Sequence, residues 1–122
     1  TIIACGIMVS YALEAAKSLQ DVGINCSVIN MATVSPIDTD IIINSAKNTG
    51  AIVTAEEHYI SGGLSSLVSQ VLSTNIPVPM ESVALTSYAE SGKPEDLFQK
   101  YGLTSEKIFQ SVKKVIDRKT SL

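Results

Sequence analysis

The chain has 122 residues, of which 45% are hydrophobic and 17% are charged. A chain of this length forms one domain, and this composition is too apolar for a disordered polypeptide. Nine Lys and Arg against twelve Asp and Glu give a net charge of -3, so no overall positive field exists to hold a nucleic-acid backbone. Uninterrupted apolar runs such as Ile41 to Ile43 are far shorter than the roughly 20 residues that cross a bilayer. We therefore expect one globular domain with no nucleic-acid or membrane partner.

The cysteines and the single histidine give no sign of a disulfide framework or a zinc site. Cys5 and Cys26 each lie in an apolar segment, and because the first residues lack a basic-then-hydrophobic pattern we expect no secretion leader. We interpret both as reduced core residues of a cytoplasmic protein. One histidine, His58, and two distant cysteines offer no zinc-binding spacing. Because the sequence opens at Thr1 inside a strand-like run, without an initiator Met, we expect residues 1–122 to be a single domain from a longer subunit.

Strand-like and helical segments alternate from the start of the chain. An apolar run over 2–5 predicts the first strand, and Ser10 is the expected N-cap of the helix that Gly23 ends. The alternation over 24–31 predicts the second strand. The apolar face expected on this first helix consists of Leu13, Ala16 and Leu19.

The second helix carries strong terminal signals. In Ser35-Pro36-Ile37-Asp38, Ser35 is the expected N-cap, Pro36 occupies the first helical position and Asp38 adds negative charge to the first turn. Gly50 is the expected stop, and residues 51–55 form the predicted third strand. The apolar face expected on this helix consists of Ile37, Ile41, Ile42 and Ala46.

A third helix follows Gly63, a fourth strand covers 82–86, a turn lies within 88–93, and a short helix covers 95–101. Thr104 is the expected N-cap of the last helix. The apolar stripes are Leu64, Leu67, Val68, Val71 and Leu72 in the third helix, and Ile108, Val112, Val115 and Ile116 in the last. The last helix also carries Lys113, Lys114, Arg118 and Lys119, which we interpret as dipole compensation rather than an anion or phospholipid site.

The alternation of strands and helices along the chain predicts an α/β fold: a three-layer α/β/α domain with a mostly parallel, doubly wound sheet.

Ligands of such sheets bind beyond the carboxyl ends of the strands. Residues 6–10, after the first strand, lack a glycine-rich phosphate-binding pattern. Residues 56–64, after the third, combine two carboxylates, the histidine and a glycine-opened helix start. An anion can bind the N–H groups of Gly62 and Gly63 there, with His58 as a proton donor. The alternative is purely structural: one Glu caps or pairs locally, and His58 packs against a neighbour.

The candidate site is therefore Glu57, His58, Gly62 and Gly63, as an interface or an anion site. With no nucleophile or metal cluster beside them, we expect these residues to face a neighbouring subunit or domain rather than a small ligand. The residue pattern identifies no catalytic, cofactor-binding or metal-binding residue.

The stretch VTAEEHYISGGLSSLV at 53–68, with ESGKPEDL at 90–97 and YGLT at 101–104, resembles the C-terminal domain of transketolases. Weaker similarity extends this resemblance over essentially the whole chain. Deoxyxylulose-phosphate synthases and 2-oxoacid dehydrogenase β subunits share the Glu-Glu-His-x-x-x-Gly-Gly pattern, but SGKP at 91–94 and YGLT are more similar to transketolase, especially its animal-like and split two-subunit forms. Ser65 stands where the family often has a third glycine, and it would narrow the space for an anion.

The resemblance implies a parent enzyme that transfers a two-carbon ketol unit between sugar phosphates, using thiamine diphosphate and Mg²⁺ bound between two preceding domains of paired subunits. It implies that this domain is a structural, dimer-organising part of a homodimeric parent, whose partners are those domains or a partner subunit. No catalytic or cofactor residue transfers to this chain, so residues 1–122 alone are expected to fold but to be inactive. Two alternatives stay open: the same domain of a related thiamine enzyme, or a stand-alone anion- or nucleotide-binding regulatory module.

Overall fold

The computed structural model describes residues 1–32, 34, 36–59, 62–85, 99–100 and 102–121. The strands are β1 (Ile2–Ala4), β2 (Val28–Asn30), β3 (Ile52–Tyr59) and β4 (Met80–Leu85). The helices are α1 (Met8–Asp21), α2 (Thr39–Thr49), α3 (Leu64–Asn75) and α5 (Ser105–Thr120). Residues 99 and 100 are also helical. The predicted turn within 88–93 and most of the short helix predicted over 95–101 lie outside the described residues.

The strands form a parallel sheet in the order β2-β1-β3-β4. Ile3 at the centre of β1 pairs with Ile29 of β2 and with Thr54 of β3. The chain winds first from β1 to β2 and then back across to β3, so the strand order reverses between β1 and β3. The predicted α/β fold with a doubly wound parallel sheet is confirmed.

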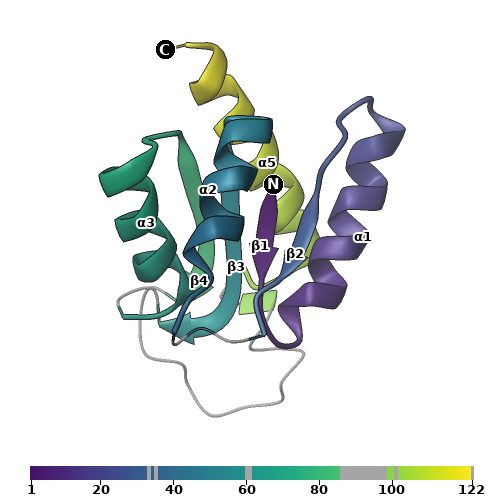
Figure 1. The fold of residues 1–122 in the computed structure, drawn as a ribbon. Coiled ribbons are helices and arrows are strands. Elements are labelled where there is room, and N and C mark those ends of the chain that lie inside the picture. Colours follow the sequence, from purple (N-terminus) through teal and green to yellow (C-terminus); the bar gives the residue numbers. More distant parts are fainter. Residues whose placement is uncertain (33, 35, 60–61, 86–98, 101, 122) are drawn as a thin grey trace.

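Helices cover both faces of the sheet (Figure 1). α1 and α5 pack on one face, where alternate strand residues such as Ile2 and Val53 join their core. α2 and α3 pack on the other face, against Ile3 and Ile52. Because both faces are covered, the central strand β1 is a fully buried apolar run, as central parallel strands typically are. In the described part of the chain, no helix is long and apolar enough to cross a membrane.

Two predicted N-caps are corrected by the structure. The N-cap of α1 is Ile7, and Ser10 lies inside the first turn, where its Oγ donates to the Ile7 carbonyl at 2.9 Å. The N-cap of α2 is Asp38, whose side chain accepts the Ile41 N–H at 3.1 Å, so the helix begins later than the Ser-Pro signal indicates. Ser35 itself lies outside the described residues. In both cases a polar residue was correctly placed near a helix start but with the wrong role.

The predicted helix faces are also partly wrong. Leu13 of α1 is 56% exposed and Ile41 of α2 is 37% exposed. The residues that α1 buries are Met8, Ala12, Ala15 and Leu19, and those that α2 buries are Ile42, Ser45 and Ala46. Small side chains, Ala12 and Ala15 in α1 and Ser45 and Ala46 in α2, make up much of both buried faces, which are therefore rotated from the faces that the large apolar residues indicate.

Strand lengths differ from the prediction in one way that matters for the site. β2 covers only 28–30 of the predicted 24–31, and β4 starts earlier than the predicted 82. β3 extends beyond the predicted 51–55 to Tyr59, so Glu56, Glu57 and His58 belong to the strand rather than to the loop after it.

Two predicted helix ends are confirmed. Gly50, with φ of 72°, ends α2, and Thr104 caps α5 by accepting the Lys107 N–H at 3.1 Å.

Candidate functional site

The carboxyl ends of β1 and β3 lie side by side where the strand order reverses. β1 ends at Ala4, which pairs with Ala55, while β3 continues to Tyr59. We call this region, residues 5–7, 56–59 and 62–65, the carboxyl edge. In open parallel sheets it is the position where ligands and partners bind, so it is the first place to look for function.

Glu56 is the most constrained polar side chain of the carboxyl edge. It is only 1% exposed, and its Oε1 accepts the Leu64 N–H at 2.8 Å while its Oε2 accepts the Ser65 N–H at 2.7 Å. These are two of the N–H groups that have no partner within α3, and a carboxylate at a helix N-terminus is also favoured by the helix dipole. Glu56 therefore caps α3 from within the domain. This agrees with the structural alternative given above, in which one Glu of this segment caps or pairs locally.

A hydroxyl network extends this cap to the neighbouring strands. The Ser65 Oγ lies 2.6 Å from the Ser82 Oγ of β4, and the Thr54 Oγ1 of β3 donates to the same Ser82 oxygen at 3.2 Å. Ser65 and Thr54 are buried. Among the described residues, no buried side-chain nitrogen or oxygen lacks a hydrogen-bond partner. Ser65 thus joins α3 to β4.

Glu57 has the opposite environment. Its side chain is exposed, and a Cβ built on Gly6 would lie 3.6 Å from its Oε1, so the carboxylate lies beside the start of α1 at the strand-order reversal. Burial raises the pKa of the Cys5 thiol, and the nearby charges of Glu56 and Glu57 raise it further. The two successive carboxylates of β3 therefore have different environments: Glu56 is hydrogen-bonded inside the domain, and Glu57 faces outward.

The remaining predicted site residues lie at the same edge. The backbone of His58 continues β3, and its side chain is outside the description. Gly62 is exposed with φ of 84°, and its N–H donates to the Ser66 Oγ at 2.9 Å. Gly63 is buried and is the N-cap of α3. In the described part of the chain, no group of three or more His, Cys, Asp or Glu side chains is placed to hold a metal ion.

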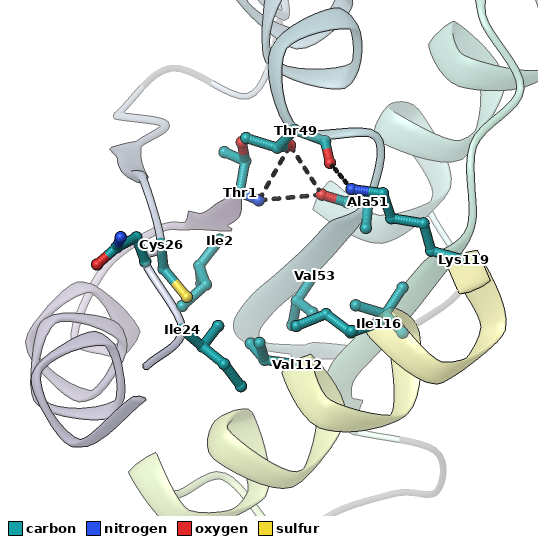
Figure 2. A pocket seen from close by; sticks show the side chains of 12 residues that line it. Thr1, Ile2, Ile24, Cys26, Thr49, Ala51, Val53, Val112, Ile116 and Lys119 are labelled. Atoms are coloured by element: carbon teal, nitrogen blue, oxygen red, sulfur yellow. Dashed lines mark hydrogen bonds between the residues drawn. The ribbon is translucent and has the colours of Figure 1, made fainter. Parts of the chain in front are cut away.

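The opposite end of the sheet has a small cavity of about 120 Å³ (Figure 2). Figure 2 shows apolar side chains from the β1 and β3 starts and from α5 around it, with Lys119 at its rim. Cys26 lines it, and burial raises the pKa of this thiol. Its lining also includes the polar groups of Thr1, Asn25, Thr49 and Lys119, and those of Thr1, Thr49 and Lys119 are hydrogen-bonded within the domain.

Cations of α5 and the backbone of Thr1 bond to carbonyl groups at this end of the sheet, which sequence reasoning missed. Lys119 Nζ donates to the Thr49 carbonyl at 2.6 Å, and the backbone nitrogen of Thr1 donates to the Ala51 carbonyl at 2.9 Å. Arg118 donates to the Met80 carbonyl at 2.7 Å and pairs with Glu81. We call residues 1, 49–51, 80–81 and 118–119 the amino edge. Lys114 also lies 3.2 Å from Glu81, so the basic cluster has mostly internal partners.

Comparisons with known proteins agree on one family. The family model for the C-terminal domain of transketolase matches residues 1–108. The 6-deoxy-6-sulfo-D-fructose transketolase subunit SqwH of Clostridium sp. (strain MSTE9) is 42% identical over 120 residues, which cover 98% of this chain and 37% of that protein. The transketolase of Mus musculus is 34% identical over 119 residues, which cover 97% of this chain and 19% of that protein.

A solved structure gives the same result. The chain of a split-gene transketolase, described as an inactive β4 tetramer, matches with a TM-score of 0.94 and 44% identity, covering 97% of this chain and 39% of that chain. This chain therefore spans between 19% and 39% of the length of these three proteins.

Proposed function

Because this chain belongs to the family of transketolase C-terminal domains, we propose that it is the structural, dimer-organising domain of an enzyme that transfers two-carbon ketol units between sugar phosphates. The observation that carries the proposal is the match of nearly the whole chain to a split-gene transketolase at 44% identity. The parent enzyme is then a transferase, and this domain supplies its architecture rather than its chemistry.

The relatives also support a proposal about the organisation of the parent. Identity is 42% to a transketolase subunit and 44% to a split-gene transketolase, against 34% to the mouse enzyme. We infer that the parent is a split enzyme, in which the subunit carrying this domain pairs with a second subunit. Its partners are accordingly the preceding domains of its own subunit, a partner subunit and a second copy of the subunit.

Thiamine diphosphate and Mg²⁺ belong to the same proposal, but the described residues of this chain do not fit them. A diphosphate-bound cation takes several oxygen ligands. At the carboxyl edge, both Glu56 oxygens accept backbone N–H groups, and the Gly62 N–H donates to Ser66. Among the described carboxylates of this edge only Glu57 faces outward, and one carboxylate does not supply the several oxygen ligands of such a cation, so we derive no chemical step from this chain. The preceding domains would hold the cofactor.

The carboxyl edge is the proposed contact surface. Glu57 and Gly62 are exposed there, and the exposed side chain of Ile7, 46% accessible, lies at the same end of the sheet. An outward carboxylate beside an exposed apolar side chain suits a protein partner, because interfaces combine apolar contact with a few charged groups. We propose that Glu57, His58, Gly62 and Gly63 face the neighbouring domain or subunit.

Two assays test the proposed function. The 122-residue chain alone, supplied with thiamine diphosphate, Mg²⁺ and sugar phosphates, is expected to fold without turnover, whereas the natural-length subunit with its partner is expected to turn over. Turnover above background by the isolated chain would refute the non-catalytic role. Deleting residues 1–122 from the natural-length subunit is expected to abolish assembly and turnover together, and normal assembly of that deletion would contradict the organising role.

A further inference from the structure

We propose that Glu56 is the positioning residue of the carboxyl edge: by holding the start of α3, it fixes the place at which Glu57 meets the partner subunit. This inference rests on the proposed function, since it assumes that the carboxyl edge is a contact surface. It assigns a specific role to a buried side chain that itself touches no partner.

The sheet alone does not hold this part of β3. β1 pairs with β3 only as far as Ala55, so the strand loses its neighbour on that side beyond this residue. On the other side, the pairing with β4 runs regularly to Ala55 opposite Val83, and then shifts before Tyr59 opposite Leu85. The backbone ladder is therefore one-sided and irregular over 56–58. A side-chain contact is needed to define where these residues lie.

Glu56 supplies that contact. Both of its oxygens bond to backbone groups eight and nine residues farther along the chain, and the carboxylate is buried. The carboxylate thus ties β3 directly to the first turn of α3. The Gly62 N–H bond to the Ser66 Oγ adds a second hydrogen bond at the start of this helix.

Fixing Glu56 also fixes the direction of Glu57. Successive side chains of a strand point to opposite faces. With Glu56 held toward α3, Glu57 points to the face that carries α1, where its Oε1 lies near Gly6. A surface that is ordered before binding does not lose conformational entropy on association, so the clamp strengthens partner binding without contributing a contact.

The test uses the natural-length subunit and two readouts: hydrogen exchange of the Leu64 and Ser65 amides, and subunit affinity by sedimentation. Glu56→Gln keeps the volume of the side chain but offers one amide oxygen in place of two carboxylate oxygens. We expect faster exchange at both amides and an association about tenfold weaker. Glu57→Gln is expected to weaken association with exchange of both amides unchanged.

Two further variants separate positioning from general destabilisation. Gly23→Ala strains the left-handed residue that follows α1, at the opposite end of the sheet from the carboxyl edge, and is expected to lower stability without changing association. Ser66→Ala removes the exposed hydrogen bond from the Gly62 N–H at the start of α3 and is expected to weaken association about two- to threefold. This variant covers the case that Glu56→Gln does not fold.

Each contrary outcome has one meaning. If Glu56→Gln speeds amide exchange but leaves association at the wild-type value while Glu57→Gln weakens it, the positioning role is wrong and the interface stands. If Gly23→Ala weakens association as much as Glu56→Gln, the effect is one of stability and the positioning role is again wrong. If both Glu56→Gln and Glu57→Gln leave association unchanged, the carboxyl-edge interface of the proposed function fails.

Discussion

The two edges of the sheet are stabilised in different ways. At the amino edge, exposed cations of α5 reach carbonyl groups far away in sequence, as Lys119 does to Thr49 and Arg118 to Met80. At the carboxyl edge, one buried carboxylate bonds to two N–H groups less than ten residues away. Exposed charged contacts each contribute little to stability, whereas a buried polar group that loses its partner is costly. The amino edge therefore tolerates single changes, and the carboxyl edge depends on one residue.

The largest expected effect comes from Glu56. Glu56→Ala leaves two buried N–H groups without an acceptor and is expected to lower the free energy of unfolding by about 3 kcal/mol. Glu57→Ala, at the next and exposed position, is expected to change it by less than about 0.5 kcal/mol. Urea denaturation of both variants measures the difference. If Glu56→Ala and Glu57→Ala lower the free energy of unfolding equally, the buried and the outward carboxylate do not differ in their contribution to stability.

Gly50 probes the amino edge. It has φ of 72°, and an added Cβ would lie 3.1 Å from Lys119 Cε, whereas Gly23, with φ of 85°, has nothing within 4 Å of such a Cβ. Gly50→Ala is expected to cost about 1.5 kcal/mol and Gly23→Ala about 1 kcal/mol, because both strain a left-handed residue and only the first displaces Lys119. In a Lys119→Ala background the two costs should become equal. A difference that persists there would show that Lys119 is not its cause.

Asp38 offers a second capping carboxylate on the same side of the sheet as Glu56, because α2 begins after the carboxyl end of β2. Asp38 is exposed, so Asp38→Ala is expected to cost only about 1 kcal/mol, the usual loss for an N-cap. Denaturation midpoints of Asp38→Ala and Glu56→Ala compare an exposed with a buried cap. A loss for Asp38→Ala as large as that for Glu56→Ala would mean that burial is not what makes Glu56 important.

The smallest expected effect concerns the thiols, one near each edge. Burial raises the pKa of both Cys5 and Cys26, so both should react with iodoacetamide more slowly than a free cysteine peptide at pH 8. The charge of Glu57 also raises the pKa of Cys5. Glu57→Gln lowers that pKa, which increases the thiolate fraction, and should speed Cys5 alkylation about twofold. Alkylation of Cys26 is the internal control, and an equal change there would contradict a local charge effect.

Local signals in the sequence predicted the elements well where a single residue decides the outcome. Gly50 ends α2 because its left-handed conformation suits glycine, and Thr104 caps α5 through its own hydroxyl. Ser35 and Asp38 were harder to separate, because both are good capping residues and their side chains compete for the same helix start. The exposure of Leu13 depends on how closely α1 approaches the sheet, which the helical period alone does not specify.

The candidate site was predicted in location but not in its internal arrangement. Two carboxylates before a Gly-Gly helix start indicated the right edge of the sheet. The pattern did not tell which of the two is buried, because that depends on β3 continuing past Ala55 and so setting the faces of Glu56 and Glu57. One signal in the sequence would have identified Glu56 as the cap. It is a buried strand with a carboxylate near its end, followed within nine residues by a helix start that has no capping side chain of its own.

The most direct test of the account is the activity of the natural-length enzyme carrying His58→Ala, measured against subunit concentration and pH. If the carboxyl edge organises the assembly and supplies no chemistry, the variant will dissociate at higher concentrations than the wild type. Its kcat at saturating subunit concentration, and the pH dependence of that kcat, will be unchanged. If the variant instead assembles normally but loses a titrating group with an apparent pKa of about 6 to 7, His58 acts as an acid or base, and the account is wrong.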